Sequence, residues 1–525
     1  MQLKTIYVCS LVLVLLAGGM TGASLSKSLA SAEVLRIGAN TGILISFDPA
    51  VCYEILGTDM VDQLYDNLVE LYLAEGKIGI KGELAKSWEV SDDGLTWTFH
   101  LREGLTFPSG NLIDAEAFVF SLKRMIALNK PPAWLITQFG LNQSTMDDNI
   151  KAIDRYTLTI RLDDIYAPNM FLSCIASPVA GVVDPSVVKG VGSDWLIDHS
   201  AGSGPYILER WERNELVELV ANPDYWKGTP PIKRILYIDM PEPTNQKFML
   251  EKGDIDVAWN IPPQMLSEIE KEAKEGIKIV SMPGASIEYL AMNVEFGPLK
   301  DERVREAVRY AIDYDGIIDD ILRNRAIRLQ TIIPAGYLGY NPSAPFHQDL
   351  EKAKRLLAEA GYPDGFTIEL TSSPTYPRID VAIKIQSDLA KVGIKANLIQ
   401  MQSAQMYQKY RQQGLQMILA GWGIDYPDPD ALAKAFADYR IKQLAWRNMW
   451  YDDYVSDLTE MAMHELDEGK RSQYYMEITE HVLHKGPFAI LYQDMDNWVI
   501  STDVKGFEEA SALSTLHFDF TKISF

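Results

Sequence analysis

Across residues 33–282, apolar residues mostly alternate with polar ones, which is the period-two pattern of half-buried strands. The alternation is clearest on both sides of the turn dipeptide Asp93-Gly94, and it predicts an antiparallel hairpin there. One helix is expected to interrupt the strands at residues 114–126, with Asp114 as its N-cap. This part of the chain is therefore predicted to consist mainly of strands and turns.

From about residue 283 onward the pattern changes, because apolar stripes at helical spacing begin to alternate with short strand-like runs. The expected elements are helices over 301–312, 350–360 and 382–392 and strands over 366–370 and 394–398. This β-α-β order predicts a parallel or mixed sheet covered by helices. Ligands on such sheets bind beyond the carboxyl ends of the strands.

The apolar run at residues 6–17 is too short to span a bilayer, which takes about 20 residues, and residues 1–32 are therefore predicted to be a secretory signal. Signal cleavage needs small residues one and three positions before the cut, and cleavage after Ala23 or after Ala32 meets this requirement. We favour Ala32 because a strand-like run follows it. The alternative is a membrane anchor that stays attached. Cys9 lies inside the apolar run, which disfavours a lipid anchor. The mature chain is expected to be soluble.

The length of 525 residues corresponds to two to four domains at about 150 residues each. Lys and Arg total 49 against 72 Asp and Glu, a formal net charge of −23 that would repel a polyanion, so we expect no nucleic-acid partner. Cys52 and Cys174 are too few for a disulfide framework in the mature chain. One bridge and two buried free thiols remain equally open.

Catalytic signatures are missing from the sequence. It contains no nucleophile elbow, phosphate loop, dinucleotide fingerprint or zinc-binding HExxH helix. His481 and His484 lie one helical turn apart, but no Cys or carboxylate pattern completes a zinc site around them. We therefore expect no enzyme, no catalytic residue, no metal and no cofactor.

A series of sequence blocks runs through essentially the whole mature chain. The blocks are LAKSWEV at 84–90, TFHLREG at 98–104, GSGPY at 202–206, NPDYW at 222–226, the helix at 301–313, the turn at 351–365 and GWGIDYPDP at 421–429. In sequence and in order they resemble the blocks of the family 5 extracellular solute-binding proteins of ABC importers, the group that includes dipeptide-, oligopeptide- and nickel-binding proteins.

The resemblance implies an α/β, two-lobed periplasmic-binding-protein fold of cluster C. Residues 33–282 would form the N-terminal lobe, including an extra subdomain at about 68–185. Residues 283–488 would form the second lobe, and 489–525 would return to the first. Such proteins enclose a ligand between the lobes by hinge closure.

In peptide-binding members of this family, the Asp that matches Asp425 pairs with the ligand's α-ammonium group. A charge closed into a dry cleft needs an opposite charge, so the physics supports this role. The alternative is that Asp425 only braces the turn at Pro427. Trp422, Gly423 and Tyr426 share the loop, and its aromatic side chains are candidates to wall the pocket. Packing in the core is the alternative, and it is favoured for Tyr426.

Further candidates come from other parts of the chain. Arg378 precedes a predicted helix and could pair with a ligand carboxylate in bidentate fashion, although a surface role is favoured for it. Thr41 and Gly42 match the place where family members present backbone groups to an extended peptide. Some oligopeptide-binding members have an Arg two residues before the Gly-Trp pair. This chain has Leu419 there, which favours a shorter or less charged ligand.

Together these features predict a periplasmic receptor of an ABC importer that binds a peptide and delivers it, as a monomer, to a permease and ATPase complex. An oligosaccharide, an opine or a nickel chelate is the alternative ligand for the same role. Stacking on a tryptophan such as Trp422 would suit a sugar. A secreted hydrolase with a carboxylate pair is the remaining alternative.

Overall fold

The computed structural model describes residues 33–525 except 75, 260 and 514–515. The predicted signal at 1–32 lies outside the described residues. Within the described part of the chain, no helix is long and apolar enough to cross a membrane. Cys52 and Cys174 are both buried and carry free thiols.

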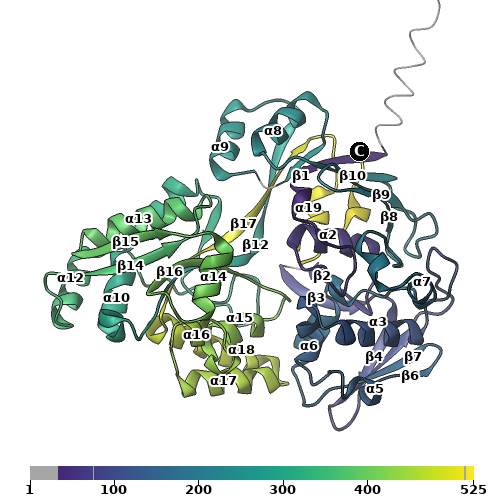
Figure 1. Ribbon diagram of the computed structural model, residues 1–525, viewed down its shortest axis with the longest axis horizontal. Helices are drawn as coiled ribbons and strands as arrows, with labels where there is room; N and C mark the ends of the chain where they lie inside the picture. Colours follow the sequence, from purple (N-terminus) through teal and green to yellow (C-terminus); the bar gives the residue numbers. More distant parts are fainter. Residues whose placement is uncertain (1–32, 75, 260, 514–515) are drawn as a thin grey trace, which may run out of the picture.

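An 11-stranded mixed sheet runs through the whole molecule (Figure 1). Its order is β15 (Ile394–Gln400), β14 (Phe366–Ser372), β16 (Met417–Gly423), β12 (Ile277–Met292), β17 (Phe488–Ser501), β11 (Val257–Trp259), β1 (Val34–Ala39), β10 (Arg234–Asp239), β9 (Leu216–Ala221) and β8 (Tyr206–Glu212), with β13 (Ala326–Arg328) beside β17. The long strands β12 and β17 pair antiparallel and join the two halves of the molecule. Residue 282 lies inside β12, so the chain passes between the halves within a strand.

The first half contains β1, β8–β11 and a separate antiparallel sheet. That sheet has the order β4 (Ala85–Val90), β5 (Thr96–Leu101), β7 (Thr157–Arg161) and β6 (Ile150–Asp154). The predicted hairpin is confirmed, since β4 and β5 pair antiparallel and the side chains of Trp97 and Phe99 are buried. The predicted helix at 114–126 is confirmed as α3 (Ala115–Leu128), where the Asp114 carboxylate accepts a hydrogen bond from the backbone N–H of Ala117.

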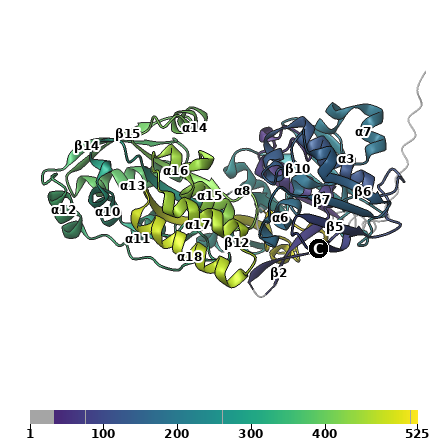
Figure 2. The same cartoon turned by 90° about the horizontal axis from the view of Figure 1, so that it is seen from below.

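The first half also carries a hairpin of β2 (Val69–Ala74) and β3 (Lys77–Gly82) that points toward the second half (Figure 2). There the hairpin lines a pocket together with the start of α18. Its other helices are α2 (Ile55–Leu64), α4 (Trp134–Thr137), α5 (Met146–Asn149), α6 (Pro168–Ile175), α7 (Pro185–Val191), α8 (Pro243–Lys252) and α9 (Pro263–Glu272). After β17, helix α19 (Phe507–Ala510) packs into the core of the first half.

The second half shows the predicted alternation of helix and strand. β14 is parallel to both β15 and β16, and Asp301 caps the first helix of this half. Its helices are α10 (Glu302–Ala311), α11 (Tyr314–Gly316), α12 (Leu350–Glu359), α13 (Arg378–Ala390), α14 (Ser403–Arg411), α15 (Asp430–Ala437), α16 (Leu444–Arg447), α17 (Asp453–His464) and α18 (Glu468–Lys485). Helix α13 begins four residues before the apolar stripe that predicts it, because its first turn is only partly buried.

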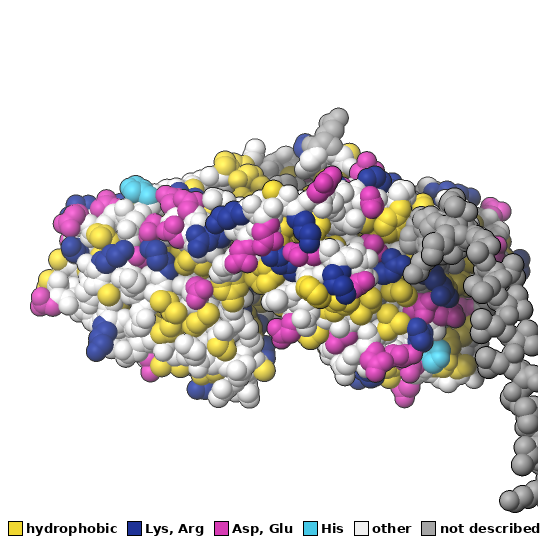
Figure 3. Space-filling model, turned by 90° about the horizontal axis from the view of Figure 1, so that it is seen from above, with side chains coloured by type: hydrophobic (Ala, Val, Ile, Leu, Met, Phe, Trp, Pro, Cys, Tyr) yellow, Lys and Arg dark blue, Asp and Glu magenta, His cyan; other side chains and the backbone are white. Residues whose placement is uncertain are grey.

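The two halves meet in one apolar cluster, which contains Leu71 and Leu135 from the first half and Ile424 and Tyr426 from the second. Beside this contact the surface is hollowed, and Figure 3 shows a notch between the halves. On the same face, basic and acidic side chains are intermingled. A ligand site between the halves therefore has walls from both.

Candidate functional site

The loop that follows β16 places the main candidate residues between the halves. β16 lies in the sheet between β14 and β12, and its residues Met417 to Ala420 are buried. The strand ends at Gly423, so Asp425 leaves the carboxyl end of a strand that is parallel to β14. This is the edge of the sheet at which parallel α/β folds bind ligands.

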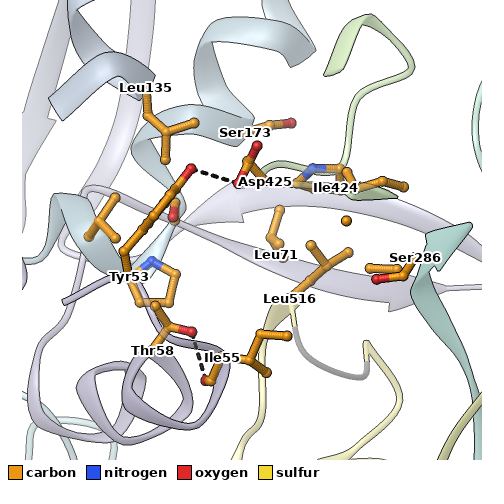
Figure 4. Close-up of a pocket in the computed structure, with 16 residues that line it drawn as sticks. Tyr53, Ile55, Thr58, Leu71, Leu135, Ser173, Ser286, Ile424, Asp425 and Leu516 are labelled. Carbon is orange, nitrogen blue, oxygen red and sulfur yellow. Dashed lines mark hydrogen bonds between the residues drawn. The ribbon is translucent and has the colours of Figure 1, made fainter. Parts of the chain in front are cut away.

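Asp425 is bonded to the first half through a short chain of hydrogen bonds. The Tyr53 hydroxyl donates to Oδ1 of Asp425 at 2.6 Å (Figure 4). Nε1 of Trp134 in turn donates to the Tyr53 oxygen at 2.7 Å. Burial raises the pKa of Asp425 above its ordinary value, and the bond from Tyr53 opposes that rise. Burial and the nearby Asp425 raise the pKa of Tyr53, so the phenol stays a donor.

Two cavities border Asp425. The smaller, of about 140 Å³, is lined mainly by apolar side chains of the first half such as Leu71 and Leu135. The larger, of about 500 Å³, is lined mainly by the second half. Tyr53, Gly423 and Asp425 line both. No Lys, Arg or His forms an ion pair with Asp425 in the described ranges. The side-chain donor to its carboxylate is the uncharged hydroxyl of Tyr53.

The structure brings the three other predicted loop residues to this place. Trp422 is half-buried and lines the larger cavity, where its Nε1 has no hydrogen-bond partner among the described residues. Gly423 is exposed between the cavities. Tyr426 is 1% exposed, and its hydroxyl donates to Oδ2 of Asp430 at 2.8 Å. Tyr426 therefore packs mainly in the core and touches the larger cavity with little of its ring.

Arg378 lies next to the loop, but its charge is already paired. Its Nε and Nη2 both donate to the carboxylate of Glu288 on β12, the second at 2.9 Å, and Glu288 is buried. Both groups crowd Gly421, where a Cβ would come within 2.9 Å of Nη2 of Arg378. In this arrangement, the guanidinium group that was a candidate for a ligand carboxylate is paired with Glu288 instead.

Thr41 and Gly42 are not brought to Asp425. They form a short 3-10 turn after β1, at Thr41–Ile43, and line neither of the two cavities that border Asp425. The backbone N–H and the hydroxyl of Thr41 donate to Oδ1 of Asp239 at 2.8 and 3.0 Å. Thr41 is 2% exposed, so its side chain is satisfied within the first half.

Sequence reasoning missed the residues that complete the site. Tyr53 lies 372 positions before Asp425, and no pattern in the sequence links the two. Trp134, Tyr407 and Arg447 are also lining residues without a motif. The density of aromatic residues around Arg447 is the one signal that could have indicated a binding wall.

Comparisons with known proteins show what this chain is similar to. The model of the family "Bacterial extracellular solute-binding proteins, family 5 Middle" matches residues 79–442. The "Probable D,D-dipeptide-binding periplasmic protein DdpA" of Escherichia coli K12 is 28% identical over 481 residues, which cover 88% of this chain and 89% of the relative. The glutathione-binding protein GsiB of Escherichia coli O157:H7 is 27% identical over 467 residues, covering 87% and 88%.

Solved structures give the same picture. The periplasmic binding protein DppA of Helicobacter pylori, in complex with the peptide STSA, superposes with a TM-score of 0.76 at 25% identity and covers 94% of this chain and 97% of its own. HbpA2 of Haemophilus parasuis gives 0.79 at 26% identity, covering 94% and 99%. The expected two-lobed α/β fold is confirmed.

Proposed function

The chain belongs to the family 5 bacterial extracellular solute-binding proteins, and we propose that it captures short peptides with a free amino terminus between its two halves. The observation that carries the proposal is the Asp425 carboxylate, which faces two cavities between the halves and has no cationic partner among the described residues. The names of the relatives support the ligand class, since they include a dipeptide-binding and a glutathione-binding protein.

The proposed chemistry is charge pairing in a desolvated cleft. A peptide's α-ammonium group would donate to Asp425, whose second oxygen is not engaged by Tyr53. The adjacent apolar cavity would take an aliphatic side chain beside Leu71 and Leu135. Such a pair, once closed off from water, contributes affinity because either charge alone would be stranded.

Membership of this family extends the proposal from peptide binding to the export, location and transport role of the protein. Members of the family are extracellular or periplasmic binding proteins. We propose that residues 1–32 direct export, that the mature chain works in the periplasm as a monomer without catalysis, and that it delivers its peptide to a permease and ATPase complex. The lobes are proposed to comprise 33–282 with 489–525, and 283–488, with the extra subdomain at about 68–185.

The test uses the full mature chain after its bound ligand has been removed by unfolding and refolding. It is incubated with a pool of short synthetic peptides, half with free and half with acetylated amino termini, and the retained peptides are identified by mass spectrometry. We expect retention of free-amine peptides only. In Asp425→Asn, calorimetric titration with a retained peptide should show a loss of about 2–5 kcal/mol of binding free energy.

Asp92→Asn is the matched control, because Asp92 is exposed and lies away from both cavities. Its affinity should equal that of the wild type. Equal retention of acetylated peptides, or an unchanged affinity in Asp425→Asn, would sink the ammonium-pairing role. Retention of no peptide at all would sink the proposed function itself.

A further inference from the structure

The larger of the two cavities beside Asp425 has a cationic wall. Arg411 at the end of α14 and Arg447 at the end of α16 both line it, together with Trp422. The Arg447 guanidinium lies 5.6 Å from the centroid of the Trp422 ring and 5.6 Å from that of Tyr410. Aromatic faces thus hold the guanidinium on this wall.

Arg447 lacks an anionic partner although it is only 8% exposed. Its Nη2 donates to Oε1 of Gln443, and its Nε has no hydrogen-bond partner. In the part of the chain that the structure describes, no carboxylate lies within ion-pair distance of Arg447 or Arg411. Burial lowers the pKa of Arg447, and the nearby charge of Arg411 lowers it further.

The other buried arginines show how unusual this is. Arg124 pairs with Asp48, and Arg471 pairs with Asp428 at 2.7 Å. Arg305 and Arg309 each donate to several backbone carbonyl groups. The chain has 72 acidic residues against 49 basic ones, so a carboxylate could readily have been supplied to Arg447. A buried cation without such a partner is costly unless a ligand provides one.

We propose that Arg447 and Arg411 form a subsite for a carboxylate group of the ligand. This rests on the proposed function, and it narrows the ligand to compact peptides that carry an ammonium group for Asp425 and a carboxylate for the arginine wall. Both charges face the same cavity of about 500 Å³, a volume suited to a small ligand. Arg378 does not supply this subsite, because Glu288 occupies its fork.

The carboxylate has two possible sources in a peptide, its C-terminus or an acidic side chain, and the probes distinguish them. The wild-type chain is offered free-amine peptides in four matched forms: C-terminus free or amidated, with or without one glutamate. Mass spectrometry reports which forms are retained. We expect every retained form to carry a carboxylate, with amidated glutamate peptides marking the side-chain source and free-acid peptides marking the terminal source.

Variants then assign the preference to the arginines. For Arg447→Gln and Arg411→Gln, affinity for a retained peptide should fall roughly 10- to 100-fold, as expected for the loss of a charge-assisted hydrogen bond, while Arg447→Lys should recover part of it. Arg411 is exposed, so its variant folds even if the Arg447 variant does not. Arg355→Gln, an exposed arginine on α12, is the control and should bind as the wild type does.

The outcomes separate the subsite from the proposed function. If the wild type retains amidated peptides without glutamate as well as the acidic forms, or if neither glutamine variant changes the preference, the arginine subsite is overturned and peptide capture at Asp425 stands. If no form is retained by the wild type, the proposed function falls and the subsite with it.

Discussion

At the scale of single residues, the proposed role of Asp425 depends on how a half-buried carboxylate is kept ready for a cation. Asp425 is held by one phenol from the opposite half, and that phenol is itself fixed by the indole N–H of Trp134. This arrangement orients the carboxylate without neutralising it. A lysine in the place of Tyr53 would have satisfied Asp425 permanently and removed its use as a ligand partner.

The raised pKa of Asp425 makes binding depend on pH. The carboxylate must be ionised to pair with an ammonium group, so affinity for a free-amine peptide should be full at neutral pH and fall as the pH drops through the Asp425 pKa. In Tyr53→Phe the donor that lowers this pKa is lost. The midpoint of the affinity loss should therefore move to higher pH, and the unfolding free energy should fall by about 1 kcal/mol.

Titration calorimetry across a pH series, with wild type and Tyr53→Phe in parallel, checks this expectation. The same series with an acetylated peptide is the control for general acid effects on the cleft. A midpoint that is identical in the two proteins would show that Tyr53 does not act on Asp425.

The candidate site could be predicted only in part, and the reason is visible residue by residue. Asp425 and Trp422 lie in a local sequence block, so the sequence indicated them together. Arg378 was indicated by charge and position, but its partner Glu288 lies on another strand and no local pattern reveals it. Tyr53 could not be predicted for the same reason, because only the packing of the two halves brings it to Asp425.

At the scale of helices and strands, the sequence predicts correctly those elements that bury one face and expose the other. The β4–β5 hairpin and helices α3 and α10 have clear periodicity and caps, and the structure contains each of them. Strand β12 was not predicted as one strand, because Pro283 and Gly284 interrupt its alternation and read as a turn. In the structure the ladder with β17 shifts register between Pro283 and Ile287 and then continues.

A cap gives a test at this scale. Replacing Asp114 by Ala removes the acceptor for the Ala117 N–H at 3.1 Å, so the free energy of unfolding should fall by about 1 kcal/mol. The urea midpoint of the purified chain measures this, and peptide affinity should stay unchanged because α3 lines neither cavity. Asp92→Ala, at an exposed position, serves as the reference. An equal midpoint in the two variants would contradict the capping role.

At the scale of the whole molecule, β12 and β17 run from one half into the other, and we expect the halves to rotate about the shifted register of this pair. A peptide that contacts both halves should favour the compact arrangement. Small-angle scattering should therefore give a smaller radius of gyration when a retained peptide is added to the wild type. Asp425→Asn at the same peptide concentration should show a smaller decrease, and an unchanged wild-type radius would argue against closure.

The hydrogen bond between Tyr53 and Asp425 has a consequence for the energy cost of transport. Both partners of this bond belong to the chain, so it can form without a ligand, and at about 1 kcal/mol it would shift the balance toward the closed form roughly five-fold. A permease that responds to closed receptors would then meet some that carry nothing, and each such encounter would consume ATP without import. The coupling between ATP hydrolysis and import would therefore depend in part on a single tyrosine hydroxyl.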